Sequence, residues 1–218
     1  MINLSTLILC GAGNGTAIPT IPAAACEHFG KVQRLIFQRV RKVDGSLNTI
    51  PVADMDLLGT WTALAGDATL GTKVQGSPFT ESPSFSDGTV RTARGGNDSY
   101  GGVPISLGYE PTEFEAQILS TRQDVIAALK LYRNEDLNNL GVYMVSAEGK
   151  LMATVDDIGT PTTIAPIPIQ QFNIGNKVAG GYDDVDYNAI SFQLEDNWSN
   201  GTKTIEATEF AFDLLTGF

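Results

Sequence analysis

The sequence has few of the residues that most often carry catalytic or metal chemistry. It contains one histidine, His28, and two cysteines, Cys10 and Cys26. Two cysteines are too few for a disulfide framework or a cysteine-ligated metal site, and they favour an intracellular origin with reduced thiols. His28 lies near Cys26 in the sequence, but a nucleophilic pair also needs an orienting group and an oxyanion site. We therefore expect a non-enzymatic protein without a cofactor or metal centre.

Long apolar runs and basic charge are also scarce. The apolar run at residues 7–9 is too short to span a bilayer and lacks a basic flank, so neither a leader nor a transmembrane segment is expected. The net charge is −11, and residues 61–218 carry nine basic and twenty-one acidic side chains. Such a surface repels nucleic-acid phosphates over most of its area.

Residues 31–42 are the exception to this acidity. They carry five basic side chains and no acid, around the apolar centre Leu35, Ile36 and Phe37. Two interpretations are open: a nucleic-acid patch, or a strand or sheet edge whose long basic side chains pair with acidic neighbours in this chain or on another subunit. The apolar centre favours the strand.

Several segments contain residues found in ligand-binding loops but lack the full motif of such a loop. Residues 11–16, GAGNGT, resemble a phosphate loop, but Pro19 and Pro22 prevent a helix from starting on time, so a turn or flexible arm is favoured. The acidic clusters at residues 97–98, 156–157 and 183–186 lack the spacing of a calcium loop. A weakly bound ion at residues 183–186 and a solvated turn both remain open. No pair of carboxylates is singled out for glycoside cleavage.

Two segments have helical spacing. Ser120 and Gln123 match a capping box ahead of a helix at residues 124–132. A second helix is expected at residues 54–65. The apolar faces are formed by Val125, Ile126, Leu129 and Tyr132 in the first, and by Leu57, Leu58, Trp61 and Leu64 in the second.

Alternating patterns predict several strands. Residues 113–119 place Phe114, Ala116 and Ile118 on one face and Glu113, Glu115 and Gln117 on the other. The phase reverses at Gln170-Gln171 within residues 167–174, which predicts a β-bulge. Further strands are expected at residues 188–197 and 209–214. A strand apolar on both faces, residues 141–145, is followed by a turn at residues 148–149.

Residues 76–108 differ from the rest in composition. They contain seven glycines and three prolines and few residues able to form a core. We expect a long loop, which either orders against a neighbouring subunit or stays disordered at the surface.

These elements predict an α+β fold that is mainly antiparallel β, a sandwich or barrel-like arrangement of sheets with one packed amphipathic helix. The expected division is an N-terminal arm at residues 1–30 and one β-rich domain at residues 31–218 carrying the loop 76–108.

A combination of short patterns resembles a virion structural protein of tailed bacteriophages. The segments are Trp61-Thr62-Ala63-Leu64, Lys73-Val74, Gly95-Gly96-Asn97-Asp98, the helix at 124–131, the hairpin at 140–149, Pro166-Ile167-Pro168 and Asp196-Asn197-Trp198-Ser199. They resemble the tail-tube or tail-hub type of phages that infect Bacteroidetes, the crAss-like phages. The resemblance covers residues 55–215 and leaves residues 1–54 outside it.

The resemblance implies a subunit of the virion, assembled in the host cytoplasm into a six-fold or twelve-fold ring with other tail or portal-region proteins. DNA would pass through the ring without specific binding. Glu113, Glu115 and Gln117 are the candidates for facing the channel, although they could equally face outer solvent. The candidates for subunit contact are Arg91, Arg94, Asn97, Asp98 and Tyr100.

Two other functions are compatible with these features. One is a capsid decoration or head-fibre attachment protein. The other is a carbohydrate-binding β-sandwich, which needs an exposed aromatic platform; Trp61 and Trp198 are its candidates.

Overall fold

The computed structural model describes residues 28–69, 71–96, 102–135, 139–181 and 184–206. Its elements in chain order are β1 (Val32–Arg39), β2 (Ile50–Pro51), α1 (Val52–Met55), α2 (Leu58–Gly66), β3 (Val74–Gly76), β4 (Thr80–Ser86), β5 (Val90–Ala93), β6 (Ile105–Tyr109), β7 (Thr112–Leu119), α3 (Gln123–Lys130), the 3-10 helix η3 (Leu131–Asn134), β8 (Leu140–Ser146), β9 (Leu151–Val155), β10 (Thr163–Ala165), β11 (Ile167–Val178), β12 (Tyr187–Leu194), the 3-10 helix η4 (Trp198–Gly201) and β13 (Thr202–Ile205).

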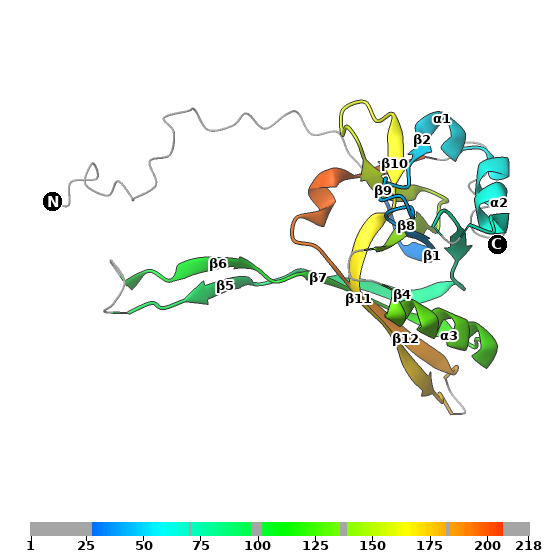
Figure 1. The fold of residues 1–218 in the computed structure, drawn as a ribbon. Helices are drawn as coiled ribbons and strands as arrows, with labels where there is room; N and C mark the ends of the chain where they lie inside the picture. Colours follow the sequence, from blue (N-terminus) through cyan, green and yellow to red (C-terminus); the bar gives the residue numbers. More distant parts are fainter. Residues whose placement is uncertain (1–27, 70, 97–101, 136–138, 182–183, 207–218) are drawn as a thin grey trace.

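The strands form one large curled sheet and one small ribbon (Figure 1). The large sheet runs in the order β2-β10-β9-β8-β11-β12-β7-β4, with β1 also beside β8, β3 beside β1 and β13 beside β9. The ribbon is the pair β5–β6. All described pairings are antiparallel. The prediction of a mainly antiparallel α+β fold is confirmed.

Strand β8 is buried along its whole length and separates two apolar cores. Val142 and Met144 face the first core, whereas Tyr143 and Val145 face the second. Both faces of the strand are buried, so the side chains on both faces are apolar, as the sequence indicates. The β8–β9 hairpin turns at Gly149, whose φ is +81°, as predicted.

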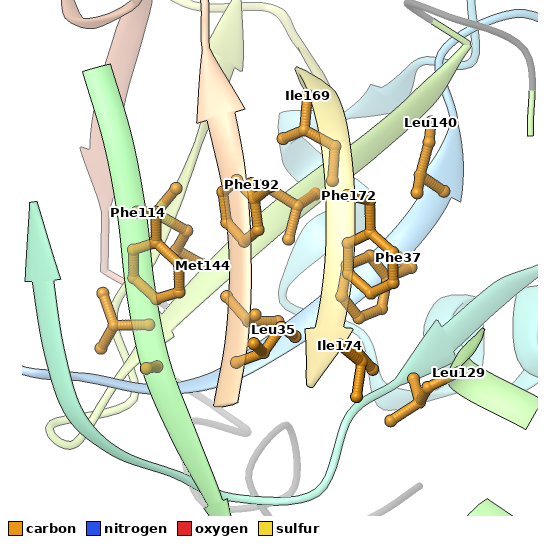
Figure 2. Close-up of a cluster of buried hydrophobic side chains, with 14 of the residues drawn as sticks. Leu35, Phe37, Phe114, Leu129, Leu140, Met144, Ile169, Phe172, Ile174 and Phe192 are labelled. Atoms are coloured by element: carbon orange, nitrogen blue, oxygen red, sulfur yellow. The ribbon is translucent and has the colours of Figure 1, made fainter. Parts of the chain in front are cut away.

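The first core lies between β1, β8, β11, β12 and β7 (Figure 2). Phe114 and Phe192 stack across β7 and β12 with ring centroids 4.6 Å apart. Helix α3 contributes Ile126 and Leu129 to this core, as its spacing predicts, while Val125 is partly exposed. Helix α3 therefore lies on the core side of this sheet.

The predicted capping box at Ser120 is wrong. The N-cap of α3 is Arg122, and no side chain caps the helix. Ser120 has φ +45°, and its N–H donates to the carbonyl of Asp186 at 2.8 Å. Ser120 ends β7 against the neighbouring hairpin, two residues before the N-cap Arg122, so its hydroxyl does not stand at the N-cap position.

The predicted helix at residues 54–65 is two helices. Leu57 is extended (φ −89°, ψ 113°) and separates α1 from α2. The indole N–H of Trp61 donates to the carbonyl of Met55 at 2.8 Å, which folds α2 back under α1 and buries Trp61 completely in the second core. Leu58 is 39% exposed, so the expected apolar face is not continuous.

The strand predictions are confirmed at β7, β11 and β12. Phe114, Ala116 and Ile118 are buried on β7. The register of β11 with β12 shifts between Gln170 and Asn173, and Gln171 has φ +51°, which is the predicted bulge.

The basic segment is strand β1, as its apolar centre predicts. Lys31 binds Glu81 at 2.5 Å, and Arg39 binds Glu135 through both nitrogens of its fork at 2.9 and 3.0 Å. Arg34 is 6% exposed and donates to the carbonyl of Ser77. The side chains of these three residues are occupied within the chain, which supports the strand interpretation over a nucleic-acid patch.

The expected long loop at residues 76–108 contains strands, while its ordering against a neighbouring subunit stays a prediction. This segment contains β4 and β5 and begins β6, and β4 pairs with β7 while β5 pairs with β6. The glycines and prolines mark bulges and turns between strands. Residues 1–27 of the predicted arm, the 11–16 loop and the strand at 209–214 lie outside the described residues.

Candidate assembly surfaces

The ribbon β5–β6 projects away from the body of the protein (Figure 1). In the chain, β5 follows β4 and β6 precedes β7, so the ribbon extends from the β4–β7 pair. Its two strands pair only with each other, as a separate two-stranded sheet. Two strands alone are marginally stable in water because neither face is covered by a core. The ribbon therefore resembles an element that becomes stable through contact with another surface.

The ribbon exposes an unusual amount of apolar surface for its size. Val90, Ile105, Leu107 and Tyr109 are 48–64% exposed, and Val103 beside the ribbon is 65% exposed. The pairs Val90–Tyr109 and Ala93–Ile105 are three residues apart on β5, and a register shift between Arg91 and Thr92 adds one residue to β6, so the two pairs lie on opposite faces of the ribbon. Both faces thus carry apolar side chains.

The root of the ribbon is held by close backbone approach. A Cβ at Gly88 would lie 1.7 Å from the carbonyl oxygen of Glu110, so this position accepts no side chain without displacement. The N–H of Glu110 donates to the carbonyl of Thr89 at 3.0 Å, and the Thr89 hydroxyl donates to the Glu110 carboxylate at 2.8 Å. These contacts make the ribbon leave the sheet as a defined continuation of β4 and β7.

Two of the predicted contact residues lie on or next to the ribbon. Arg91 in β5 is exposed, and its Nε is 3.6 Å from the Glu110 carboxylate. Arg94 follows β5, is exposed and has φ +61°. Asn97, Asp98 and Tyr100 lie outside the described residues. The apolar residues of β6 were not predicted to contact a neighbour, although three large apolar side chains in Ile105-Ser106-Leu107-Gly108-Tyr109 were a usable signal.

The second surface, here called the open face, is the solvent side of β4, β7, β12 and β11. On β7 it carries Glu113 and Glu115, which are exposed, and Gln117, which is half-buried. The three predicted residues therefore share one face, as alternation requires. Small polar side chains lie beside them: Ser86 and Gln193 flank Glu113, while Ser84 and Ser191 flank Glu115.

A shallow hollow of about 340 Å³ lies on the open face. It is lined by Ser82, Ser84, Glu115, Gln117, Asn173, Ala189 and Ser191, together with backbone of the same strands. The bulge in β4 at Ser82 (φ +50°) widens the sheet there. Arg133 donates to the side-chain oxygen of Asn173, which lines this hollow. Lys31 is bound to Glu81 and holds the pKa of that carboxyl below its usual value.

The described part of the chain holds no group of three or more histidine, cysteine, aspartate or glutamate side chains arranged to bind a metal. Asp186 is bound to Lys177 at 2.7 Å, a contact that lowers the pKa of Asp186. Among the described helices, none is long and apolar enough to cross a membrane. Trp61 is fully buried and cannot form a carbohydrate platform.

Comparison with known proteins gives weak likenesses. No protein-family model matches the chain, and no curated protein does so either. One solved structure with some similarity is the "Tail of empty GTA particle", in C6 symmetry. The two are 10% identical in sequence, the match covers 64% of this chain and 92% of that chain, and the TM-score is 0.34. Another is the six-fold symmetrised baseplate of the anti-feeding prophage. It is also 10% identical in sequence, the match covers 87% of this chain and 99% of that chain, and the TM-score is 0.32. Both scores are too low to define this protein's fold or function.

Proposed function

We propose that this protein is a non-enzymatic structural subunit of a phage-tail type assembly, in the tube or hub, that forms a ring through its ribbon. The observation that carries the proposal is the projecting β5–β6 pair with apolar side chains on both faces. The virion is then its site of action, with other tail proteins and further copies of this chain as partners.

The physical reason for assembly is the unfavourable exposure of the ribbon. Fully burying one large apolar side chain stabilises a protein by about 1.5–3 kcal/mol relative to leaving it in water. The ribbon offers several such side chains, and its own two strands cannot bury them. A neighbouring subunit that covers the ribbon would gain this energy and order the ribbon at the same time.

The test is the self-association of a ribbon variant. Ile105→Ser/Leu107→Ser removes two side chains that are 53% and 64% exposed, so the monomer should fold normally. We expect this variant to stay monomeric in analytical ultracentrifugation at concentrations where the wild type forms rings. The matched control is Leu131→Ser/Ile158→Ser, which removes side chains 65% and 57% exposed outside the ribbon.

Ring assembly through the ribbon is refuted if the wild type stays monomeric, or if the ribbon variant assembles as well as the control. Negative-stain images separate this function from a capsid decoration or fibre-attachment protein. Rings support the tail assembly, whereas trimers or small knobs support the alternative.

We also propose that the open face lines the passage for DNA. Exposed carboxylates repel phosphates, whereas each lysine that contacts a phosphate releases counterions and adds a point of attachment. Repeated around a ring, Glu113 and Glu115 would form an acidic band. Their neighbours Ser84, Ser191 and Ser86 are small, which leaves room for a longer, hydrated side chain at positions 113 and 115.

The channel proposal is tested with Glu113→Lys/Glu115→Lys in assembled particles. Rings should form, but genome ejection should slow, more so at low salt because screening is weaker. The control Asp157→Lys/Asp196→Lys makes the same change in charge at exposed positions off the open face. Normal ejection by the glutamate variant would mean that the open face points away from the DNA.

A further inference from the structure

The open face ends in an apolar row at the end of β7 that is opposite the ribbon. Leu119 on β7 pairs directly with Tyr187 on β12, and Tyr187 pairs with Val178 on β11. Directly paired residues of antiparallel strands share a face, so these three side chains lie side by side on the open face. Leu119 and Val178 are 36% and 43% exposed, and Val185 next to them is 49% exposed.

The charges around the apolar row complement those of the ribbon. Residues 177–187 contain three aspartates and one lysine, and Lys177 is already bound to Asp186. Asp184 accepts a backbone N–H from Val185 and is exposed. Residues 90–109 instead contain two arginines and one aspartate, in a chain whose net charge is −11. Arg91 already lies 3.6 Å from the Glu110 carboxylate. Arg94 forms no ion pair with another described residue.

The apolar row and the ribbon of one molecule cannot meet. The apolar row lies at one end of β7 and the ribbon beyond the other, and the eight residues of β7 span about 26 Å at a rise of roughly 3.3 Å each. The ribbon also points away from the body (Figure 1). Contact between these two surfaces therefore requires a second copy.

We propose that the apolar row is the surface that receives the ribbon of a second copy, so that subunits join head to tail. This inference rests on the proposed function and names the partner surface of the ribbon. The apolar row covers one face of the incoming ribbon, and Asp184 lies near its Arg94. Because the two contacting surfaces differ, two joined subunits still have one free ribbon and one free apolar row between them. Further copies can add at these surfaces until the contacts close into a ring.

The experiment uses two variants that each lack one surface. The ribbon-defective protein is Ile105→Ser/Leu107→Ser, and the row-defective protein is Leu119→Ser/Val178→Ser. Near-ultraviolet circular dichroism checks that both are folded, which their exposure makes the expected result. Each variant alone should associate at least about tenfold more weakly than wild type. An equimolar mixture should form a one-to-one heterodimer that does not grow further, because one intact ribbon meets one intact row.

The outcomes separate this inference from the proposed function. If the row-defective protein forms rings as the wild type does, the row is not the receptor, while assembly through the ribbon stands. If both variants are monomeric and their mixture also stays monomeric, head-to-tail joining is wrong. If the ribbon-defective protein assembles normally, the proposed function itself fails.

A charge exchange provides an independent readout. Arg94→Glu should weaken association, and mixing it with an Asp184→Lys protein should restore heterologous contacts. Restoration that disappears at high salt supports the pairing of these two ends. Equal association of all mixtures would contradict it.

Discussion

Phe85 stacks on Trp198 with ring centroids 5.7 Å apart and planes 13° from parallel. Phe85 also meets Phe114 edge to face at 5.1 Å, and Phe114 stacks on Phe192 in the core. These aromatic contacts link η4 through β4 to the first core. Because β4 continues into the ribbon, they fix the direction in which the ribbon leaves the sheet.

We expect Trp198→Ala to lower the free energy of unfolding by about 1–2 kcal/mol, because it removes one stacked pair and part of the buried area. Trp198→Phe should retain most of this stability. Urea denaturation followed by circular dichroism measures both, and an unchanged midpoint for Trp198→Ala would show that the stack contributes little.

The Arg39–Glu135 pair should couple measurably. It is bidentate, and the two side chains are 31% and 24% exposed, so it is less screened than an open surface pair. A double-mutant cycle with Arg39→Met and Glu135→Gln should give a coupling of about 1 kcal/mol that weakens in high salt. A coupling indistinguishable from zero would mean that desolvation cancels the attraction.

Asp156 should make stability depend on acid. Its carboxylate accepts bonds from the Thr162 hydroxyl and from the N–H groups of Thr162 and Thr163, which hold its pKa well below its usual range. A depressed folded pKa adds stability above the unfolded value of about 3.9, and this stability is lost as the pH falls from there towards the folded pKa.

We therefore expect Asp156→Asn to lower the melting temperature at pH 7 and to have a smaller effect near pH 2. Melting curves across this range test the sign. A difference between the two proteins that grows as the pH falls would contradict the assignment.

Gly141 and Gly175 should respond differently to substitution by alanine. A Cβ at Gly141 would lie 2.7 Å from Cβ of Pro166 and 3.0 Å from Cγ2 of Val40, inside a buried strand. We expect Gly141→Ala to destabilise the protein by about 1–3 kcal/mol. At Gly175 the nearest atoms are 3.6 Å away, so Gly175→Ala should leave stability unchanged or raise it by up to about 1 kcal/mol. Chemical denaturation of the two variants provides the comparison.

Sequence alone determined the features that depend on local alternation. Phe114, Ala116 and Ile118 are buried as their period of two requires, and the phase reversal beside Gln171 marks the bulge. Both follow because successive side chains on a strand point to opposite faces, so burial imprints a pattern that can be read without knowing the partner strand. The class of the fold and the shared face of Glu113, Glu115 and Gln117 are predictable for the same reason.

Only the tertiary structure decided the features that depend on partners distant in sequence. Ser120 bonds to Asp186 instead of capping a helix, and Trp61 reaches back to Met55 and breaks one expected helix into two. The pairing of β5 with β6 could not be predicted from composition, because glycine and proline occur both in loops and at the turns and bulges of strands. The apolar row exists only where Leu119, Tyr187 and Val178 are brought together by the register of three strands. A single segment does not encode such a surface, because its members are neighbours only across hydrogen bonds that form on folding.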